Sequence, residues 1–504
     1  MNTARLRPAQ LVILSLVLGL LMTPTQTAAA QTIPGPADVG RVKPEERQLL
    51  PEWNGAPAVT IPERAPISQI PPGAQDIHLS LKQVHITGAT VFSPEQLRAV
   101  YAPYLGHDIT LDQVYRMADA ITKIYRDAGY FLSMAYVPVQ HIKDGIVTIQ
   151  VVEGYVGQID VPEDVRRHDV VQAYLDRLMA QRPLTSAAVE SLLLRLNDLP
   201  GYSFRAVLSS VPTLPEGDIK LTLTPTAKSG QGVVSSDNYS SRFLGPNELA
   251  AEYSASLLPL QQTTISALSS LPADNLEYAT LEHAITIAPD LVLDLSGNFT
   301  KAHPGYILAP EDVRSEAAFL SGGLIWQYLR QRQENLSFKL SVDSRNITTD
   351  FLDTLFTRDH IRALRANATY NLADQWQGAN TASLTISQGL KIFESSNKGD
   401  PDLSRAAASP TFTKAELALS RLQGLVPNWS VLFSADGQLS GDPLYSSEQF
   451  GYGGPAFGRA FDSSLLTGDQ GVSGSVELRY ERLEKRAGDQ HGALHLLRHR
   501  RRLE

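Results

Sequence analysis

The sequence predicts two small α+β units followed by an antiparallel transmembrane β-barrel. Three observations support this: an export signal at the N-terminus, two stretches that each indicate strand, helix, helix, strand, strand, and apolar residues at every second position from about Ser229 onward. The chain has 504 residues, which is long enough for several domains. Its net charge of -9, with 19% charged residues, matches neither a nucleic-acid binder nor a disordered acidic chain.

Residues 1–30 have the three parts of a cleaved secretory signal. Arg5 and Arg7 precede an apolar run from Leu11 to Met22, and small residues end at Ala30, where we expect cleavage. The alternative is a membrane-anchoring helix, but the run is shorter than the roughly 20 residues that span a bilayer. The chain contains no cysteine, so disulfides and thiolate sites are excluded.

Residues 31–77 contain nine prolines and little periodicity. Proline-rich segments of this kind form extended, semi-rigid linkers. The run from Pro44 to Leu50 predicts a short helix within it.

Residues 78–154 predict the first α+β unit. Apolar residues between Leu79 and Ile86 indicate a strand, and Ser93-Pro94-Glu95-Gln96 has the composition of a capping box. A second capping box at Thr110 opens a helix that Gly129 ends. Strands are predicted at 134–140 and 146–152.

Residues 155–227 repeat this plan as a second unit. A strand is expected around Ile159, and Thr185 can cap a helix that Pro200-Gly201 ends. Two further strands are expected around Val207 and over 219–223.

Residues 228–480 predict the barrel. Segments of about ten residues alternate between apolar and polar positions, which is typical of membrane strands with an apolar outer face and a polar lumen. Soluble sandwiches can alternate too, but the segment lengths, the polarity of the second face and the export signal favour the membrane. Asp294, Asp343 and Glu416 are expected on the lumen side. The clearest runs lie near 249–257, 291–300, 336–343, 364–372, 382–390, 415–419, 429–439 and 476–480.

A glycine-rich stretch from Gly451 to Gly471 separates the last two of these runs. Its single cation, Arg459, stands between Phe457 and Phe461. The spacing alone predicts a long hairpin loop.

Taken together, residues 31–480 resemble the hemolysin secretion/activation transporters of two-partner secretion. The small units look like the POTRA domains of that family. The first is similar in Asp127-Ala-Gly-Tyr130, in Val137-Pro138-Val139-Gln140 and in the run from Asp144 to Gly154. The second is similar in the run from Leu196 to Gly201.

The resemblance implies that the glycine-rich loop folds back into the barrel lumen. The loop tip of the family carries Val-Arg-Gly-Phe/Tyr, which Gly458, Arg459, Ala460 and Phe461 match in the arginine and the aromatic residue. Arg459 is therefore expected to bond a carboxylate of the barrel wall in bidentate geometry. Ala460 departs from the motif, and alanine resists positive φ.

The resemblance also implies the function. An outer-membrane pore of a Gram-negative bacterium would move one unfolded exoprotein, of hemolysin or adhesin type, from periplasm to surface. The periplasmic units would recognise this partner, by strand addition at their edges. The substrate-recognition region is expected to include Tyr130, Pro138, Gln140 and Gly154.

Motifs for catalysis and nucleotide binding are missing from the sequence. Gly-x-Ser-x-Gly, His-Glu-x-x-His and the phosphate-binding Gly-Lys-Ser/Thr pattern do not occur. We therefore expect no enzyme activity, no catalytic residue, no metal, no cofactor, no nucleotide and no nucleic acid. Outer-membrane lipid and the exoprotein are the expected partners.

Two other functions stay open. A barrel-assembly insertase has similar parts but more periplasmic units, and a passive porin or surface adhesin would not need the periplasmic units.

Residues 481–504 form a basic tail that does not alternate. His491, His495 and His499 have helical spacing that would suit a metal, and the arginines would suit lipid headgroups. The preferred hypothesis is a truncation or frameshift, because permitted codons allow a +1 frame containing the Phe-x-Asp-x-Gly wall motif. On that hypothesis the aspartate expected opposite Arg459 is missing from this chain. The barrel could then not close, and this chain would give no conductance in planar bilayers.

Overall fold

The computed structural model describes residues 33–42, 59–60, 70–210, 217–271, 273–483 and 498–502. From Pro34 onward the described residues belong to one compact unit. The predicted signal peptide and the predicted helix between Pro44 and Leu50 lie outside the described residues. Within these ranges, no helix has the length and apolar character needed to cross a membrane.

The first α+β unit has the predicted helices and an additional short strand. Both capping boxes are present, with Ser93 and Gln96 at one helix and Thr110 and Gln113 at the next. The elements are η3 (Ala74–Asp76), β2 (His78–Ser80), β3 (Gln83–Thr87), α2 (Pro94–Tyr101), η4 (Ala102–Tyr104), β4 (Asp108–Thr110), α3 (Leu111–Asp127), β5 (Met134–Tyr136) and β6 (Ile146–Val152).

The first predicted strand of this unit is two strands in the structure. β2 pairs with β4, whereas β3 runs parallel to β6. The strand divides at Leu81 and Lys82 because the backbone changes partners there: the Leu81 amide bonds the His107 carbonyl, and the Lys82 amide bonds the Gly145 carbonyl. Leu81 is fully buried at this point.

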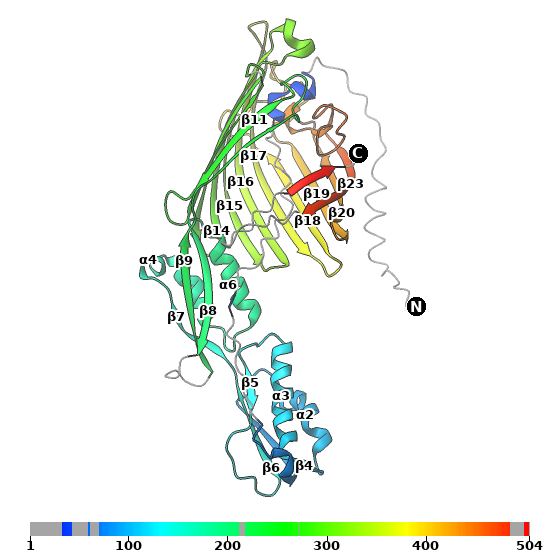
Figure 1. Cartoon of the computed structure of the whole chain (residues 1–504). Coiled ribbons are helices and arrows are strands. Elements are labelled where there is room, and N and C mark those ends of the chain that lie inside the picture. The colour runs from blue at the N-terminus through cyan, green and yellow to red at the C-terminus, as the bar shows by residue number, and fades with distance from the viewer. Residues whose placement is uncertain are drawn as a thin grey trace. The chain divides into compact units, whose positions relative to one another are not determined.

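Helix α3 supplies the core of the first unit. Its buried residues lie on one face, as the periodicity predicts, and pack with Val147 and Ile149 of β6. Figure 1 shows α2 and α3 together on one side of the small sheet.

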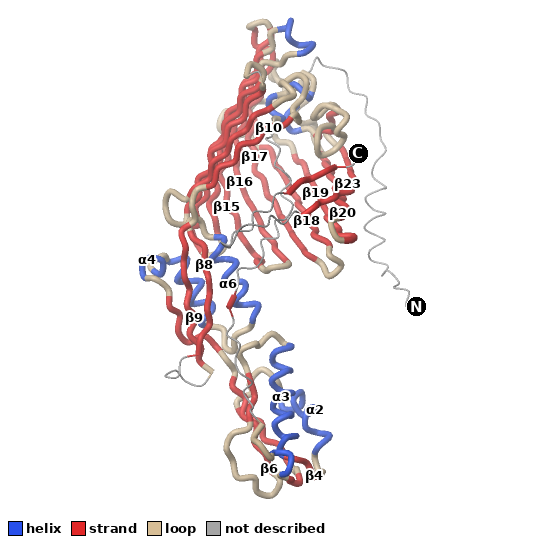
Figure 2. The backbone as a smooth tube through the Cα atoms, in the orientation of Figure 1, coloured by secondary structure: helices blue, strands red, loops and turns tan. Residues whose placement is uncertain are grey.

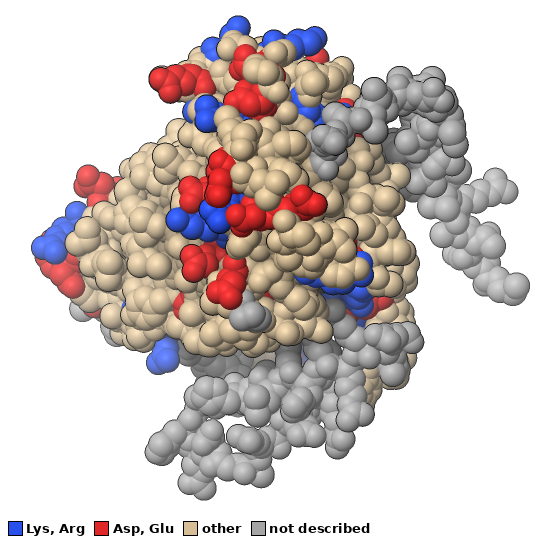
Figure 3. Space-filling model, turned by 90° about the horizontal axis from the view of Figure 1, so that it is seen from above, with Lys and Arg blue, Asp and Glu red and all other residues tan. Residues whose placement is uncertain are grey.

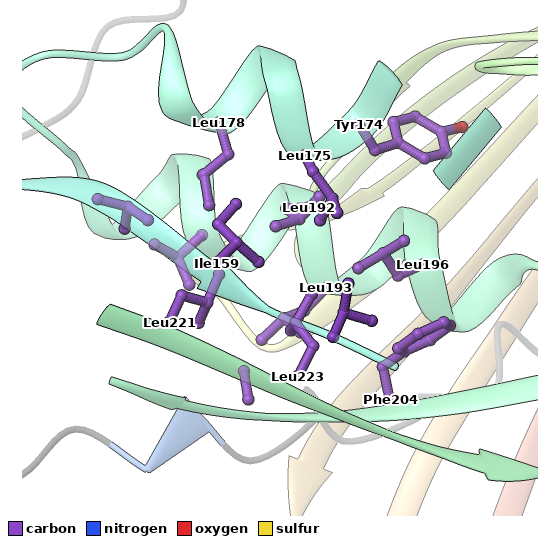
Figure 4. Packing of buried hydrophobic residues seen from close by; sticks show 14 of the residues in the cluster. Ile159, Tyr174, Leu175, Leu178, Leu192, Leu193, Leu196, Phe204, Leu221 and Leu223 are labelled. Carbon is purple, nitrogen blue, oxygen red and sulfur yellow. The ribbon is translucent and has the colours of Figure 1, made fainter. Parts of the chain in front are cut away.

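The second α+β unit follows the same plan. Its elements are β7 (Tyr155–Asp160), α4 (Glu163–Arg166), α5 (Asp169–Met179), α6 (Ser186–Asp198), β8 (Tyr202–Ser210) and β9 (Asp218–Ala227). Leucines of α5 and α6 pack on β7, β8 and β9, and Figure 4 shows Leu175 of α5 and Leu192 of α6 near Leu221 of β9. The strand order is β1-β8-β9-β7, where β1 (Val59–Thr60) comes from the proline-rich segment.

The rest of the chain forms one large antiparallel sheet, whose strands lie side by side in Figures 1 and 2. All the alternating runs identified in the sequence lie in its strands. Besides β24, the strands not identified there are β10, β12, β13 and β15. Serine, threonine or glycine at outward positions weakens the alternation in β10, β12 and β15, and Glu277 and His283 weaken it in β13. The sheet contains β10 (Gln231–Asp237), β11 (Glu248–Ala255), β12 (Gln261–Ser270), β13 (Leu276–Ala288), β14 (Leu291–Ala302), β15 (Arg314–Arg330), β16 (Glu334–Phe351), β17 (Thr354–Ala373), β18 (Gly378–Gly389), β19 (Thr413–Val426), β20 (Trp429–Ser440), β23 (Gly471–Leu483) and β24 (Arg498–Arg502).

The two faces of the large sheet differ in polarity as predicted. On β16, Leu340 and Val342 are 53% and 47% exposed, whereas Ser341 and Asp343 between and beside them are buried. On β23, Val472 and Val476 are exposed while Ser473 is buried. The apolar positions therefore form an outer face, and the polar positions, Asp294 and Asp343 included, form an inner face.

Strand structure extends beyond Tyr480, where the predicted barrel segment ends. β23 continues to Leu483, and β24 pairs with its end, Arg479 opposite Arg502. Main-chain pairing does not require alternating side chains, so the sequence pattern missed it. His499 lies in β24, and His491 and His495 lie outside the described residues.

Glu153 ties the start of α2 to the end of β6 in the first unit. Its carboxylate accepts hydrogen bonds from the Thr90 amide at 2.7 Å, the Val91 amide at 3.0 Å and the Tyr125 hydroxyl at 2.6 Å. Partial burial alone would raise the pKa of Glu153, but the hydrogen bonds from Thr90, Tyr125 and Val91 lower it below its usual range.

We predict that Glu153→Gln destabilises the first unit by about 1.5–3 kcal/mol. The NH2 group of the glutamine would face the N–H and O–H donors that now bond the carboxylate. Hydrogen exchange of the full chain should show faster exchange at residues 84–101. Asp127→Asn is the control, since its pair with Lys123 is exposed and worth under about 1 kcal/mol. Because the pKa of Glu153 in the folded state is below its unfolded value of about 4.3, its ionised carboxylate stabilises the fold at pH values above about 4.3. The difference in stability between the wild type and Glu153→Gln should therefore persist above that pH and disappear as the pH falls through the folded pKa of Glu153.

Candidate functional site

Residues 441–470 join β20 to β23 and include most of the loop predicted from Gly451 to Gly471; we call residues 441–470 the inner loop. They contain η6 (Ser446–Glu448) and the paired strands β21 (Phe450–Tyr452) and β22 (Leu466–Gly468). Gly453 has φ of 118° and Gly458 has φ of 84°, a region that favours glycine. A Cβ on Gly458 would lie 3.0 Å from the Tyr452 ring, so glycine is also needed for space.

Glu448 fixes the base of the inner loop to the inner face of the sheet. It is 2% exposed. Its carboxylate lies 2.7 Å from Arg365 of β17, 2.9 Å from Lys414 of β19 and 3.7 Å from Arg345 of β16. One loop carboxylate thus pairs with cations of three wall strands.

The strands hold these cations in place. Arg365 also bonds Asp343 at 2.7 Å and the Ser387 hydroxyl at 2.7 Å. Lys414 lies 3.2 Å from Glu416. The cations are therefore oriented before the loop carboxylate is added, which is the condition under which a buried ion pair can be favourable.

A second set of contacts fixes the two ends of the inner loop to each other. Asp469 pairs with Arg405 at 2.5 Å and accepts a hydrogen bond from the side-chain amide of Gln449 at 2.9 Å. The Gln438 side chain on β20 donates to the carbonyls of Glu448 and Asp469, each at 3.1 Å. The loop therefore leaves β20 and enters β23 at fixed positions.

The tip of the inner loop is held by two ion pairs. Asp462 accepts from the Arg242 guanidinium at 2.7 and 2.9 Å. Arg459 donates to Glu477 on the inner face of β23 and to the Pro455 carbonyl at 3.1 Å. Arg459 is 46% exposed.

Arg459 has a wall carboxylate in this chain, as expected, but it is Glu477 of β23 and not the aspartate that the family resemblance implies. The contact joins one guanidinium nitrogen to one carboxylate oxygen, so the expected bidentate geometry is not present. Ala460 has no positive φ; the left-handed positions of the tip are Gly458 and Ser464. Phe457 is buried, whereas Phe461 is 51% exposed.

Residues 34–42, the N-terminal segment, lie against the inner loop and the sheet. They form η1 (Gly35–Ala37) and η2 (Val39–Arg41), and Pro36 to Val39 are buried. The prediction of an extended linker over 31–77 is therefore wrong for residues 34–42, which form two short helices. The proline pattern gave no sign that these residues pack against the sheet.

Polar contacts join the N-terminal segment to the inner loop. Asp38 accepts from the Ser446 hydroxyl at 2.6 Å, and Arg41 donates to the Gln449 carbonyl at 3.2 Å. Val39 packs in a small apolar cluster with inner-face residues of four strands: Leu276, Ala302, Ala317 and Ile347. Figure 3 shows acidic and basic side chains intermixed on the face viewed from above.

The four residues predicted for substrate recognition maintain the fold of the first unit. Tyr130 packs against Phe92 and Tyr125. The Gln140 amide donates to the Thr148 carbonyl and accepts from its amide, each at 2.8 Å, and so replaces strand pairing beyond Pro138. Gly154 is required because a Cβ would lie 2.6 Å from that of Leu132. Of the four, Pro138 and Gln140 are in direct contact, because the Gln140 side chain also donates to the Pro138 carbonyl at 3.4 Å.

A carboxylate that the sequence did not reveal joins the second unit to the sheet. Asp290, in the turn between β13 and β14, accepts from Arg177 at 2.6 Å, from the Tyr174 hydroxyl at 3.1 Å and from Arg195. Arg330 of β15 bonds Asp198 at 2.5 and 2.8 Å. Among the described residues no group of histidine and carboxylate side chains is placed to hold a metal.

Two family models match the chain. Residues 79–154 match the POTRA domain, ShlB-type, and residues 308–495 match the haemolysin secretion/activation protein ShlB/FhaC/HecB. The first match covers the first α+β unit, and the second covers most of the large sheet and the whole inner loop.

Curated relatives match over most of the chain at low identity. The heme/hemopexin transporter protein HuxB of Haemophilus influenzae is 24% identical over 408 residues, which are 77% of this chain and 69% of the relative. The outer membrane transporter CdiB of Dickeya dadantii is 22% identical over 80% of this chain and 72% of the relative.

Solved structures share the fold. CdiB from Escherichia coli superposes with a TM-score of 0.63 at 18% identity, covering 84% of this chain and 79% of that one. CdiB from Acinetobacter baumannii gives 0.51 at 13% identity over 80% and 76%. With POTRA domains in the periplasm and a β-barrel in the outer membrane, the chain belongs to the hemolysin secretion/activation transporters of two-partner secretion.

Proposed function

We propose that this chain passes an unfolded exoprotein, of hemolysin or adhesin type, along the inner face of its barrel, and that the inner loop and the N-terminal segment occupy that path at rest. The observation that carries the proposal is Glu448, a buried loop carboxylate paired with Arg365 and Lys414 of the wall. A loop held by such contacts stays in the lumen when no exoprotein is bound, and it can move out of the lumen as one unit.

The N-terminal segment supports the same resting state. Asp38 and Arg41 bond the inner loop at Ser446 and Gln449, so neither element can be withdrawn without breaking contacts of the other. Displacement of the two elements is therefore expected to be coupled.

The periplasmic units would supply the partner. POTRA domains carry sheet edges to which an extended segment can bond through its main chain. No step of this mechanism requires a nucleotide, a metal or catalysis. Lipid contact would involve the exposed apolar outer face, for example Leu340, Leu439 and Val476.

An insertase or a passive porin are the competing functions. The contacts of Asp290 with Arg177 and Arg195 favour transport over a passive porin, because a porin has no use for periplasmic units fixed to the barrel.

We predict that Glu448→Gln releases the inner loop. The change removes the loop carboxylate from Arg365 and Lys414, which keep their pairs with Asp343 and Glu416. Breaking a buried ion pair costs about 3–5 kcal/mol.

A cysteine introduced by Ser473→Cys reports whether the loop has moved. Ser473 is buried on the inner face of β23, between the start of that strand at Gly471 and Glu477. The chain has no other cysteine. Labelling by a membrane-impermeant maleimide on intact cells should rise at least tenfold.

Asp294→Asn is the matched control, because Asp294 pairs with Lys339 of the wall and not with the loop. Labelling equal in both variants would show that Glu448 does not hold the loop.

Deleting residues 78–226 should stop secretion of the partner exoprotein. The reason is that the shortened chain can no longer recruit the exoprotein, although its barrel remains. Outer-membrane assembly of the shortened chain is checked by its heat-modifiable migration in gels. A porin would keep its small-solute flux after the deletion, and continued export of the exoprotein would contradict the proposed role of these units.

A further inference from the structure

The outward face of β17 changes from apolar to basic toward the start of the strand. Even-numbered positions of β17 face outward, because Leu364 pairs with Val342 on the outer face of β16. Leu364 is exposed within the apolar band, and the next outward residues toward the start of the strand are Arg362, His360 and Arg358. On this strand the apolar band therefore ends at Leu364, and basic side chains follow it.

This end of β17 lies at the cell-surface end of the barrel. The turn at Asp290, between β13 and β14, bonds Arg177 of the second periplasmic unit. Because successive strands are antiparallel, the turn between β16 and β17 lies at the opposite end of the sheet. Arg358 and Arg362 therefore stand just beyond the apolar band, on the side of the outer leaflet.

Neither arginine forms an ion pair within the part of the chain that the structure describes. Arg362 donates instead to uncharged acceptors, namely the Phe393 carbonyl at 3.1 Å, the Ile361 carbonyl at 2.9 Å and the Asn346 side chain at 2.8 Å. Arg362 is buried, whereas Arg358 is exposed and can reach an external anion.

Two outward cations on neighbouring strands differ from Arg358 in this respect. Lys301 of β14 lies 3.2 Å from Glu316, and Arg314 of β15 lies 2.6 Å from Asp353. These two cations are neutralised within the chain. The positive charge of β17 has no such carboxylate, so an anion from outside the chain can supply it.

A turn at residues 391–395, in the loop between β18 and β19, lies on the same outward face. Two outward side chains of β17 hold it there. Arg362 donates to the Phe393 carbonyl, and the His360 ring lies 3.2 Å from the Glu394 carbonyl. The turn is therefore fixed beside the basic end of β17.

The turn exposes apolar side chains on a strained backbone. Phe393 and Glu394 have φ of 47° and 57°, a region that bulky residues rarely adopt. Phe393 is 78% exposed and Ile392 is 39% exposed, and Lys391 beside them is exposed as well. Residues 391–395 contain one carboxylate, that of Glu394. The turn and β17 together therefore carry excess positive charge next to exposed apolar groups.

We propose that Arg358 and Lys391 bind a phosphate of the glycolipid that forms the outer leaflet, and that Ile392 and Phe393 enter its acyl region. A phosphorylated lipid suits both parts of this surface, because its phosphate pairs with the cations and its chains cover the apolar side chains. Arg362 is a positioning residue, since it holds the Phe393 carbonyl.

Other occupants fit this surface less well. A free anion would leave Ile392 and Phe393 uncovered. A second copy of the chain that met this surface with its own would oppose like charges. The site lies on the outside of the barrel and is independent of the transport path.

The test measures binding of fluorescently labelled lipid A, the phosphorylated glycolipid of this leaflet, to the purified full chain in non-ionic detergent with EDTA. Each cation next to a lipid phosphate contributes about fivefold to binding. Arg358→Gln with Lys391→Gln should therefore raise the dissociation constant at least tenfold. Arg358→Lys with Lys391→Arg keeps both charges and should bind like the wild type.

The matched control removes two outward cations that have partners within the chain. Lys301→Gln with Arg314→Gln makes the same change in net charge and should leave the dissociation constant unchanged. Unchanged binding in the Arg358/Lys391 glutamine variant, or an equal loss in the control, would overturn the proposal.

Two further probes identify which part of the lipid is recognised. A lipid A analogue without phosphates should bind the wild type and the glutamine variant equally weakly, and inorganic phosphate should not displace lipid A at equal concentration. If the wild type bound both lipids equally, the surface would recognise acyl chains only. If inorganic phosphate displaced lipid A, the surface would be a site for free anions. Either result would refute the proposal.

Discussion

Main-chain hydrogen bonding within lipid is the constraint on which the large sheet depends. A strand in a bilayer can satisfy its amides and carbonyls only through neighbouring strands. The side chains then separate by parity, apolar residues facing outward and polar residues inward. This separation explains why residues such as Arg365, Lys414 and Glu477 converge on the inner face, where polar loops can bind them.

The inner loop and the N-terminal segment use that polar face in different ways. The loop relies on charge, through Glu448, Asp462 and Asp469, whereas the N-terminal segment combines the Asp38 and Arg41 contacts with apolar packing of Val39. Because Ser446 and Gln449 belong to the loop and bond the segment, the two elements form one structure. The order of their release during transport would then be set by which set of contacts the arriving chain breaks first.

Local chemistry made much of the fold predictable. The capping boxes at Ser93 and Thr110 located both helices of the first unit, and alternation identified eight strands of the large sheet with the correct inner and outer faces. Long-range contacts were not predictable in this way. Glu448 looks like any loop glutamate until β16, β17 and β19 bring three cations to it, and the pairing of Val59 with Ala206 joins residues far apart in sequence.

The charge balance at Glu448 has a consequence for ion permeation. Arg345, Arg365 and Lys414 face Asp343 and Glu416 on the wall, and Glu448 makes the opposite charges equal in number. Under the proposed displacement of the loop, this part of the lumen would keep one unbalanced positive charge. Basic linings favour anions, so the emptied lumen should conduct chloride in preference to potassium at low salt and lose that preference as screening increases.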